Sequence, residues 1–131
     1  MVRFCRFGFL WEILRMEIGC DVTEQGVCVI ALKGRMHLKD LQEMETTLRG
    51  YALGHRYVVV DLSGLDSIFS MCLRSLILCY QAVELRGGRF VLFAPTDSIQ
   101  AVLRASGIEK IMPVLEDRSA AEAVLFSEGG V

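Results

Sequence analysis

The stretch YVVVDLSGLDSIFSMCLRSL, residues 57–76, decides the fold. It opens with a continuous β-branched run, and continuous rather than alternating runs are typical of a strand covered on both faces. A segment of helical character follows from Ser70 to Arg86, and RFVLFA, residues 89–94, supplies a second buried strand. A strand, helix, strand unit of this kind has a right-handed crossover. The pattern therefore predicts an α/β fold with residues 57–62 at the centre of the sheet.

Shorter patterns extend this unit toward the amino terminus. Two β-type runs, around residues 17–22 and 27–33, are separated by a short turn and predict a hairpin. Apolar residues from Leu38 to Ala52 recur every three or four positions, which indicates an amphipathic helix that ends at Gly54.

The carboxyl-terminal part continues the alternation of helix and strand. Thr96 is expected to cap a helix that stops at Gly107, and Pro113 makes residues 111–115 a short edge strand. Ser119 and Glu122 have the spacing of a capping box and predict a last helix.

Together these elements predict one domain over residues 16–126 and a tail over 127–131. The domain is expected to hold a mixed β-sheet of about four to five strands with helices packed against it. Residues 1–15 form an extension whose role the sequence leaves open. It fits an upstream extension or misassigned start, a docked helix, a dimer contact or an amphipathic segment that touches a membrane.

The bulk composition narrows the function classes. Fourteen basic and sixteen acidic residues give a net charge of −2, which offers no broad positive field for nucleic acid. No apolar stretch reaches the roughly 18 residues of a membrane-spanning helix. Five cysteines, an odd number without a CxxC pair, indicate the reducing cytosol, so we expect a cytoplasmic protein.

No set of residues predicts catalysis, a cofactor or a metal. His37 and Cys72 resemble a base and a nucleophile, but Cys72 falls on the core side of its helix, where thiols are inert. The two histidines lie in different segments without matching ligands. Asp61 and Asp66 end a strand and shape the following turn. We therefore expect a protein that is not an enzyme.

The helix over residues 70–86 has a mixed outer face. At about 100° per residue its core arc holds Cys72, Leu73, Leu76, Cys79, Tyr80 and Val83. The opposite arc is polar but includes Ile77 and is edged by Met71, Leu78 and Leu85. A polar stripe edged by large apolar side chains is typical of a protein contact surface. The alternative is that the extension or another helix covers it.

Three pieces follow one another along the chain: VVVDLSGLDSI before a serine-started helix, then GGRFVLFAP, then LRASGIEKIMPVLED before a terminal helix. In this order they resemble the STAS domain, the family of anti-sigma-factor antagonists. The last piece contains SGIEKIMPV, which is similar to the family's TGLDRLFPV. The resemblance runs from about Met16 to Phe126 and implies a mixed sheet with packed helices.

The resemblance also implies a mode of action. Family members are typically not enzymes but bind a partner, often a serine-kinase anti-sigma factor. They release it when the kinase phosphorylates a Ser or Thr at the start of the helix after the central strand. Ser70 falls on that position. A phosphate there adds about 1.5 to 2 negative charges, which a helix amino terminus tolerates.

The sequence departs from the family pattern around this serine. Where the family commonly has DSSG, this chain has Phe69, Ser70, Met71 and Cys72, and a stretch like GELD is replaced by residues 34–37, GRMH. These changes remove nearby carboxylates and make the surface more apolar. Ser70 therefore keeps two interpretations, a phosphoacceptor and a helix cap whose hydroxyl contributes roughly 1 kcal/mol.

The leading hypothesis is a regulatory module that binds a serine-kinase anti-sigma factor. The alternative is a STAS-type accessory subunit of a lipid ABC transport complex, which would bind the transporter ATPase. A third possibility is a sensor domain for a small molecule, but no set of residues in the sequence is dedicated to such a ligand. A homodimer is also compatible with the sequence. The loop over residues 63–69 and the helix that follows are expected to dock the partner. The predicted partner-binding residues are His37, Lys39, Ser63, Gly64, Asp66, Ser67, Ile68, Phe69, Ser70, Met71, Arg74, Ile77 and Leu78.

Overall fold

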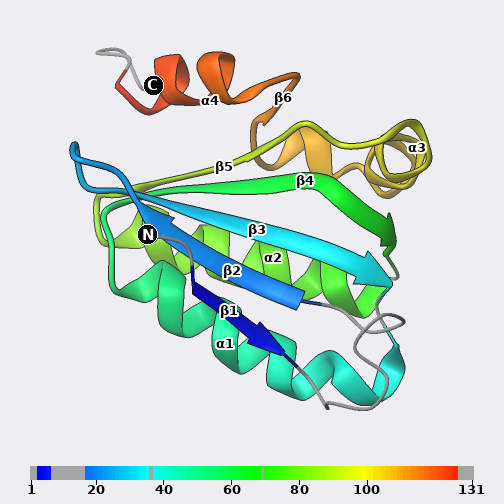
Figure 1. The fold of residues 1–131 in the computed structure, drawn as a ribbon. Coiled ribbons are helices and arrows are strands. Elements are labelled where there is room, and N and C mark those ends of the chain that lie inside the picture. The colour runs from blue at the N-terminus through cyan, green and yellow to red at the C-terminus, as the bar shows by residue number, and fades with distance from the viewer. Residues whose placement is uncertain (1–2, 7–16, 36, 69, 127–131) are drawn as a thin grey trace.

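A single mixed sheet organises the chain. The computed structural model describes residues 3–6, 17–35, 37–68 and 70–126, and within them six strands lie in the order β1-β2-β3-β4-β5-β6 (Figure 1). The strands are β1 (Arg3–Arg6), β2 (Glu17–Val22), β3 (Val27–Arg35), β4 (Tyr57–Ser67), β5 (Arg89–Phe93) and β6 (Val114–Leu115). The helices are α1 (Leu41–Leu53), α2 (Ser70–Leu85), α3 (Asp97–Ser106) and α4 (Arg118–Leu125), with 3-10 turns η2 (Leu38–Asp40) and η3 (Ile108–Lys110).

The pairing directions match the predicted α/β class. β1, β2 and β3 pair antiparallel, whereas β3, β4, β5 and β6 pair parallel. β4 lies between two parallel neighbours, as its continuous β-branched sequence predicts. The hairpin between β2 and β3 and the unit β4, α2, β5 are also confirmed.

The amino-terminal extension contributes to the sheet. Residues 3–6 form β1 and pair with β2, with Arg6 opposite Glu17 and Arg3 opposite Cys20. None of the sequence interpretations of residues 1–15 included a strand. A strand was missed because this short, arginine-flanked stretch has no alternation of its own, and its backbone partner is more than ten residues away.

Helices cover the two faces of the sheet unequally. Alternate strand residues such as Ile30, Val60 and Leu92 share one core with buried residues of α1, α2 and α3. The opposite face, including Val59 and Val91, packs against α4 through Ala121 and Leu125. Figure 1 shows α4 on the far side of the sheet from α1 and α2.

The parallel pairing of β3 and β4 brings two helix starts to one edge of the sheet. α1 follows β3 and α2 follows β4, so both helices run back from the carboxyl ends of these strands. The register pairs Arg35 with Ser67 at those ends, after a β-bulge. The segment containing His37 therefore lies beside the start of α2.

The residues that cap and end the helices agree with the prediction at α3 and differ from it at α4. Thr96 caps α3, its hydroxyl oxygen accepting from the Ile99 N–H, and Gly107 ends that helix with a φ of 80°, both as expected. The predicted capping box of α4 is wrong, because Asp117 caps the helix and accepts from the Ala120 N–H at 2.8 Å. Glu122 instead pairs with Arg118 at 2.7 Å. The two candidate caps, Asp117 and Ser119, are two positions apart in sequence, and only the backbone geometry selects one.

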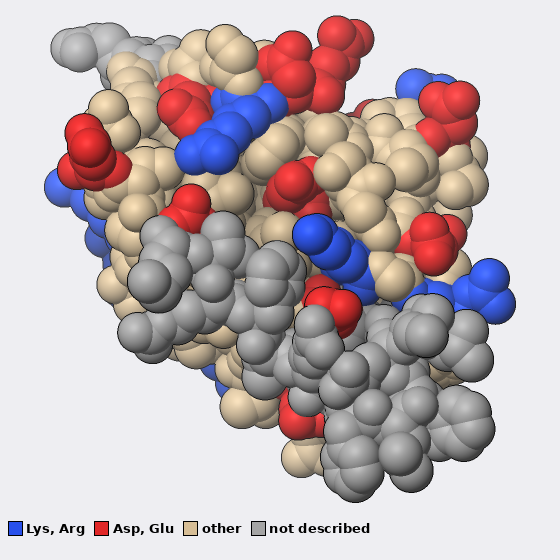
Figure 2. All heavy atoms as spheres, viewed as in Figure 1, with Lys and Arg blue, Asp and Glu red and all other residues tan. Residues whose placement is uncertain are grey.

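Charged side chains of both signs are scattered over the molecular face shown in Figure 2. Lys and Arg alternate with Asp and Glu there, with uncharged atoms between them, in keeping with the net charge of −2. A field of one sign that extends over several side chains is not seen among the described residues of this face.

Two glycines give a matched test of the packing between α2 and β5. A Cβ on Gly88 would collide with the Arg56 carbonyl oxygen and come within 2.8 Å of Val83 Cγ1. A Cβ on Gly50, an exposed residue of α1, meets nothing within 4 Å. Gly88→Ala is expected to lower the free energy of unfolding by about 1–3 kcal/mol. Gly50→Ala should raise it by about 0.5–1 kcal/mol, since alanine is the better helix former. Urea unfolding measures both, and equal effects would contradict this packing.

Candidate functional site

A hollow opens between the adjoining flanks of α1 and α2. Its volume is about 280 Å³, and it is lined by Glu45 from α1 and by Met71, Arg74, Ser75 and Leu78 from α2. The two helices pack against each other along the same face of the sheet, so residues on their adjoining flanks meet here. Met71, Arg74 and Leu78 belong to the predicted partner-binding set, and the structure brings these three together.

The floor of the hollow is polar and held in place. Ser75 is buried, and its hydroxyl lies 3.4 Å from Glu45 Oε2 and 3.3 Å from the Met71 carbonyl oxygen, both of which accept from it. The other Glu45 oxygen accepts from Arg49 at 2.9 Å. This ion pair is exposed, so its contribution to stability is small. The ion pair matters for geometry, because it holds the Glu45 carboxylate beside the hollow.

Apolar side chains border this polar floor. Met71 is 44% exposed and Leu78 is 39% exposed, one on each side of Arg74 along α2. Leu38, in η2 just before α1, is 72% exposed. Leu85 is more exposed still, but it lies at the far end of α2 and does not line the hollow. Exposed apolar side chains around a fixed polar group are typical of a protein contact surface.

Ser70 begins α2 and is exposed. Ser70 is the first residue of α2, and the residue before it lies outside the described residues, so the interpretation of Ser70 as a helix cap stays a prediction. The first turn of α2 contains no acidic residue. An added negative charge at Ser70 would therefore meet the positive end of the helix dipole and no carboxylate in that turn.

The segment predicted as a docking loop is mostly strand. Residues 63–67 continue β4 and pair with the end of β3, where Lys33 lies opposite Gly64. A Cβ on Gly64 would approach Lys33 Cγ to 2.9 Å, so glycine leaves room for the lysine stem. Ser63 and Gly64 are residue types that favour a turn, but the long β3 pairs with Gly64 and the residues after it.

Ser63 lies apart from the hollow. Leu62 and Leu65 point into the core that contains α1 and α2, whereas Ser63 is exposed and its N–H donates to Asp61 Oδ1 at 2.9 Å. Ser63 is not among the residues that line the hollow. The structure therefore does not group Ser63 with Met71, Arg74 and Leu78.

The remaining predicted residues differ in exposure. Asp66 is exposed, Ser67 and His37 are half-buried, and Ile68 and Ile77 pack partly against the core. Ile77 thus contributes to packing as well as to the surface. Phe69 and the side chain of Lys39 lie outside the described part of the chain.

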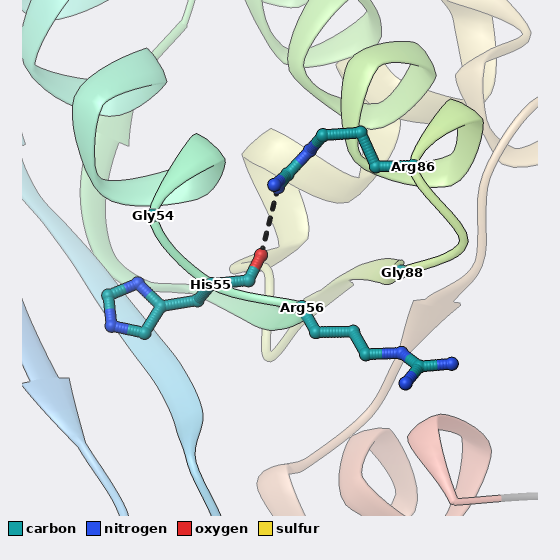
Figure 3. Close-up of a pocket in the computed structure, with 5 residues that line it drawn as sticks. All are labelled: Gly54, His55, Arg56, Arg86 and Gly88. Atoms are coloured by element: carbon teal, nitrogen blue, oxygen red, sulfur yellow. Dashed lines mark hydrogen bonds between the residues drawn. The ribbon is translucent and has the colours of Figure 1, made fainter.

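A second hollow lies near the opposite end of α2. It has a volume of about 220 Å³ and is lined by Gly54, His55, Arg56, Arg86 and Gly88. Figure 3 shows Arg86 reaching the His55 carbonyl, while the His55 ring and the Arg56 side chain point in opposite directions. Arg86 donates to this oxygen at 3.1 Å and to the Ala52 oxygen at 3.3 Å. Arg86 therefore closes the carboxyl end of α1, and the three basic side chains do not converge on a ligand.

The cysteines of α2 are core residues, as the helical arc predicts. Cys72 is 1% exposed and Cys79 is 2% exposed. Burial, with a smaller effect of Glu45, raises the pKa of Cys79 to about 11 against the opposing effect of Arg49. Within the described residues, no three His, Cys, Asp or Glu side chains form a cluster able to hold a metal.

A search of the described helices for a membrane-crossing segment finds none of sufficient length and apolarity.

Comparison with known proteins identifies the family. Residues 20–116 match the family model described as "Mlab, STAS domain". The chain belongs to the STAS domain family. The match runs from within β2 to the end of β6 and includes the hollow between α1 and α2. The family predicted from the sequence is thereby confirmed.

Named relatives of this STAS domain are anti-sigma factor antagonists. The chain is 31% identical over 109 residues to a Bordetella bronchiseptica protein named anti-sigma factor antagonist BtrV, covering 82% of this chain and 93% of that protein. It superposes on the crystal structure of an anti-sigma factor antagonist from Mycobacterium paratuberculosis with a TM-score of 0.78 and 17% identity. That comparison covers 86% of this chain and 95% of the other.

The fold is also shared with a protein whose structure was determined in a phosphorylated form. The fold matches the Bacillus cell fate determinant SpoIIAA in its phosphorylated form with a TM-score of 0.62 and 16% identity. It covers 82% of this chain and 98% of that chain. These structural likenesses establish that the protein has the fold of an anti-sigma-factor antagonist.

Two residues of the hollow were missed by sequence reasoning. Glu45 lies one position from buried Met44 on α1, and Ser75 is a polar residue within the buried arc of α2. Ser75 carried a signal, because a serine among core positions needs a hydrogen-bond partner. Glu45 carried none, since periodicity places it beside the core arc without showing which helix it will meet.

Two substitutions on α2 separate its exposed start from its buried flank. Ser70→Asp is expected to change the free energy of unfolding by less than about 1 kcal/mol, in the stabilising direction, because the charge lies at the positive end of the helix. Ser75→Asp should lower it by more than about 2 kcal/mol, since a second carboxylate would be buried beside Glu45. Chemical denaturation at low ionic strength compares them. A large loss for Ser70→Asp would show that Ser70 is not exposed.

Proposed function

We propose that this STAS domain is a non-enzymatic, cytoplasmic regulator that binds a serine-kinase anti-sigma factor. The partner docks on the hollow between α1 and α2 and on the start of α2. Phosphorylation of Ser70 controls the complex. The observation that carries the proposal is the grouping of Met71, Arg74 and Leu78 around the fixed carboxylate of Glu45, one turn from an exposed serine.

The hollow suits a protein partner because it combines an apolar border with a polar centre. Met71 and Leu78 together offer apolar area that binding would remove from water, and water exclusion strengthens any polar contact between them. Glu45 needs little ordering on binding, because Ser75 and Arg49 already hold its two oxygens. A preorganised group of this kind costs less entropy when a partner binds.

Phosphorylation of Ser70 would act on the interface through charge. Ser70 and Arg74 are four residues apart on α2 and both are exposed, so a phosphate on Ser70 lies within reach of the Arg74 guanidinium. Such a pair would draw Arg74 away from the partner and place about two negative charges beside Met71. The added charge would not destabilise α2, because the amino end of a helix is the positive end of its dipole.

The names of similar proteins support the proposal of a phosphorylated regulator that binds an anti-sigma factor. The Bordetella protein is named as an anti-sigma factor antagonist, and the Bacillus structure is of a phosphorylated form. The sequence around Ser70 nevertheless lacks the acidic and glycine neighbours common in the family, so the kinase must accept Met71 and Cys72 after the serine.

A second candidate function rests on that same departure. Ser70 lacks the acidic neighbours that are common at the family's phosphorylated serine. The surface around it is instead apolar, because Met71, Leu78 and Leu38 are all exposed. Such a surface suits permanent docking. The chain would then be the STAS-type accessory subunit of a lipid ABC transport complex and would bind the transporter ATPase.

Docking on the hollow is tested by charge substitutions on α2. Met71→Glu and Leu78→Glu should each weaken partner binding by about tenfold or more, because the apolar border is lost. Leu85→Glu is the matched control, since Leu85 is the most exposed apolar residue of the same helix but lies outside the hollow. Calorimetry with the purified partner gives the affinities. Equal losses for all three variants, or a loss only for Leu85→Glu, would place docking elsewhere.

The switch is tested by affinity capture from the native cell with wild type, Ser70→Ala and Ser70→Asp. We expect the first two to retain a small histidine-kinase-like ATPase and Ser70→Asp to lose it. Incubation of that ATPase and ATP with the wild type should place one phosphate on Ser70, as located by mass spectrometry. Phosphate on another residue would reject the switch. Retention of a transporter ATPase by all three forms would favour the second candidate.

A further inference from the structure

Two buried thiols meet across the hairpin of β2 and β3. Cys20 lies on β2 and Cys28 on β3, and their Sγ atoms are 3.1 Å apart. In the register of this antiparallel pair, Cys20 is opposite Ile30 and Cys28 is opposite Val22, so the two cysteines are diagonal neighbours. Both side chains point into the core beneath α1, together with Met44 and Leu48.

We propose that Cys20 and Cys28 are a site of reversible oxidation, at which a small-molecule disulfide such as oxidised glutathione converts the two thiols into an intramolecular disulfide. This site is independent of the proposed docking surface. Its oxidation would tie β2 to β3 under the helix that carries Glu45.

The geometry requires only a small movement. A disulfide has a sulfur separation of about 2.0 Å, so the two Sγ atoms need to approach by roughly 1 Å. Diagonal positions on an antiparallel pair are normally farther apart than directly opposed ones, but the present contact shows that both side chains already turn toward each other. Within the described residues, the other free cysteines, Cys72 and Cys79, lie seven positions apart on α2, which is about 10 Å along a helix.

The two thiols are suited to different steps. Cys20 is 8% exposed and Cys28 is fully buried. Burial raises the pKa of Cys28 well above its usual value, and the hydrogen bond with Cys20 adds to this effect. Cys20 is therefore the thiol that an outside reagent reaches first, when the pairing of β1 with β2 opens locally. Cys28 is the resolving thiol.

The reaction balances as two thiol–disulfide exchanges. Cys20 loses its proton and attacks one sulfur of oxidised glutathione, which forms a mixed disulfide and releases one glutathione thiolate. Cys28 then loses its proton, attacks the Cys20 sulfur and expels the second glutathione. The two protons pass to the two leaving thiolates. The protein thiols are oxidised by two electrons, and oxidised glutathione is reduced to two molecules of glutathione.

The experiment equilibrates the folded, full-length protein with mixtures of oxidised and reduced glutathione. Remaining thiols are then alkylated in denaturant and counted by intact mass, and peptide mapping locates any bond. We expect the wild type to lose two alkylatable thiols in one step that dithiothreitol reverses, with the bond joining Cys20 to Cys28. The alkylated oxidised protein is then lighter than the alkylated reduced protein by two alkyl groups. Circular dichroism before alkylation confirms that the oxidised protein is folded.

Alanine variants provide the controls. Cys20→Ala and Cys28→Ala should lose no pair of thiols, whereas Cys72→Ala and Cys79→Ala should lose two, as the wild type does. Should any variant fail to fold, the map of the wild-type bond decides by itself. The proposal is overturned when the folded wild type keeps all its thiols at every glutathione ratio. It is equally overturned when the bond joins another pair, such as Cys5 and Cys20.

Discussion

Burial of β4 on both of its faces is the constraint on which the rest of the structure depends. Val58 and Val60 belong to the core under α1 and α2, whereas Val59 packs with the core under α4. A strand buried in this way needs a hydrogen-bonded neighbour on each edge, and here both neighbours, β3 and β5, are parallel. Parallel neighbours require crossover helices, and the common handedness of these crossovers places α1 and α2 on one face.

The candidate site is a consequence of this arrangement. Because both helices start at the carboxyl ends of adjacent strands, their first turns lie at the same edge of the sheet and their flanks adjoin. The inner flank of α2 carries Ser75, whose hydroxyl reaches Glu45 on α1, and the outer side leaves Met71 and Leu78 in water. The proposed docking residues Met71 and Leu78 are thus exposed and separate from the buried core, so a charge at Ser70 is expected to leave the core intact.

Much of the fold was predictable, because its signals are local. The β-branched run of β4, the turn between β2 and β3, the three-and-four spacing of α1 and the cap at Thr96 each act within a few residues, and the structure confirms them. The errors have a different cause. Ser63 and Gly64 favour a turn locally, yet β3 is long enough to pair with β4 from Gly64 to Ser67 and so extends this strand. β1 likewise exists through its pairing with β2 rather than through a pattern of its own.

The sequence alone determined the family, the order of the main elements and the exposed position of Ser70, since helical periodicity assigns inside and outside along one element. Only the tertiary structure decided which flanks meet. It joined Glu45 to Ser75, separated Ser63 from Met71, and brought Cys20 to Cys28 across a hairpin. The physical reason is that periodicity specifies a direction around one helix or strand, whereas contact between two elements depends on register and packing distance, which no single segment encodes.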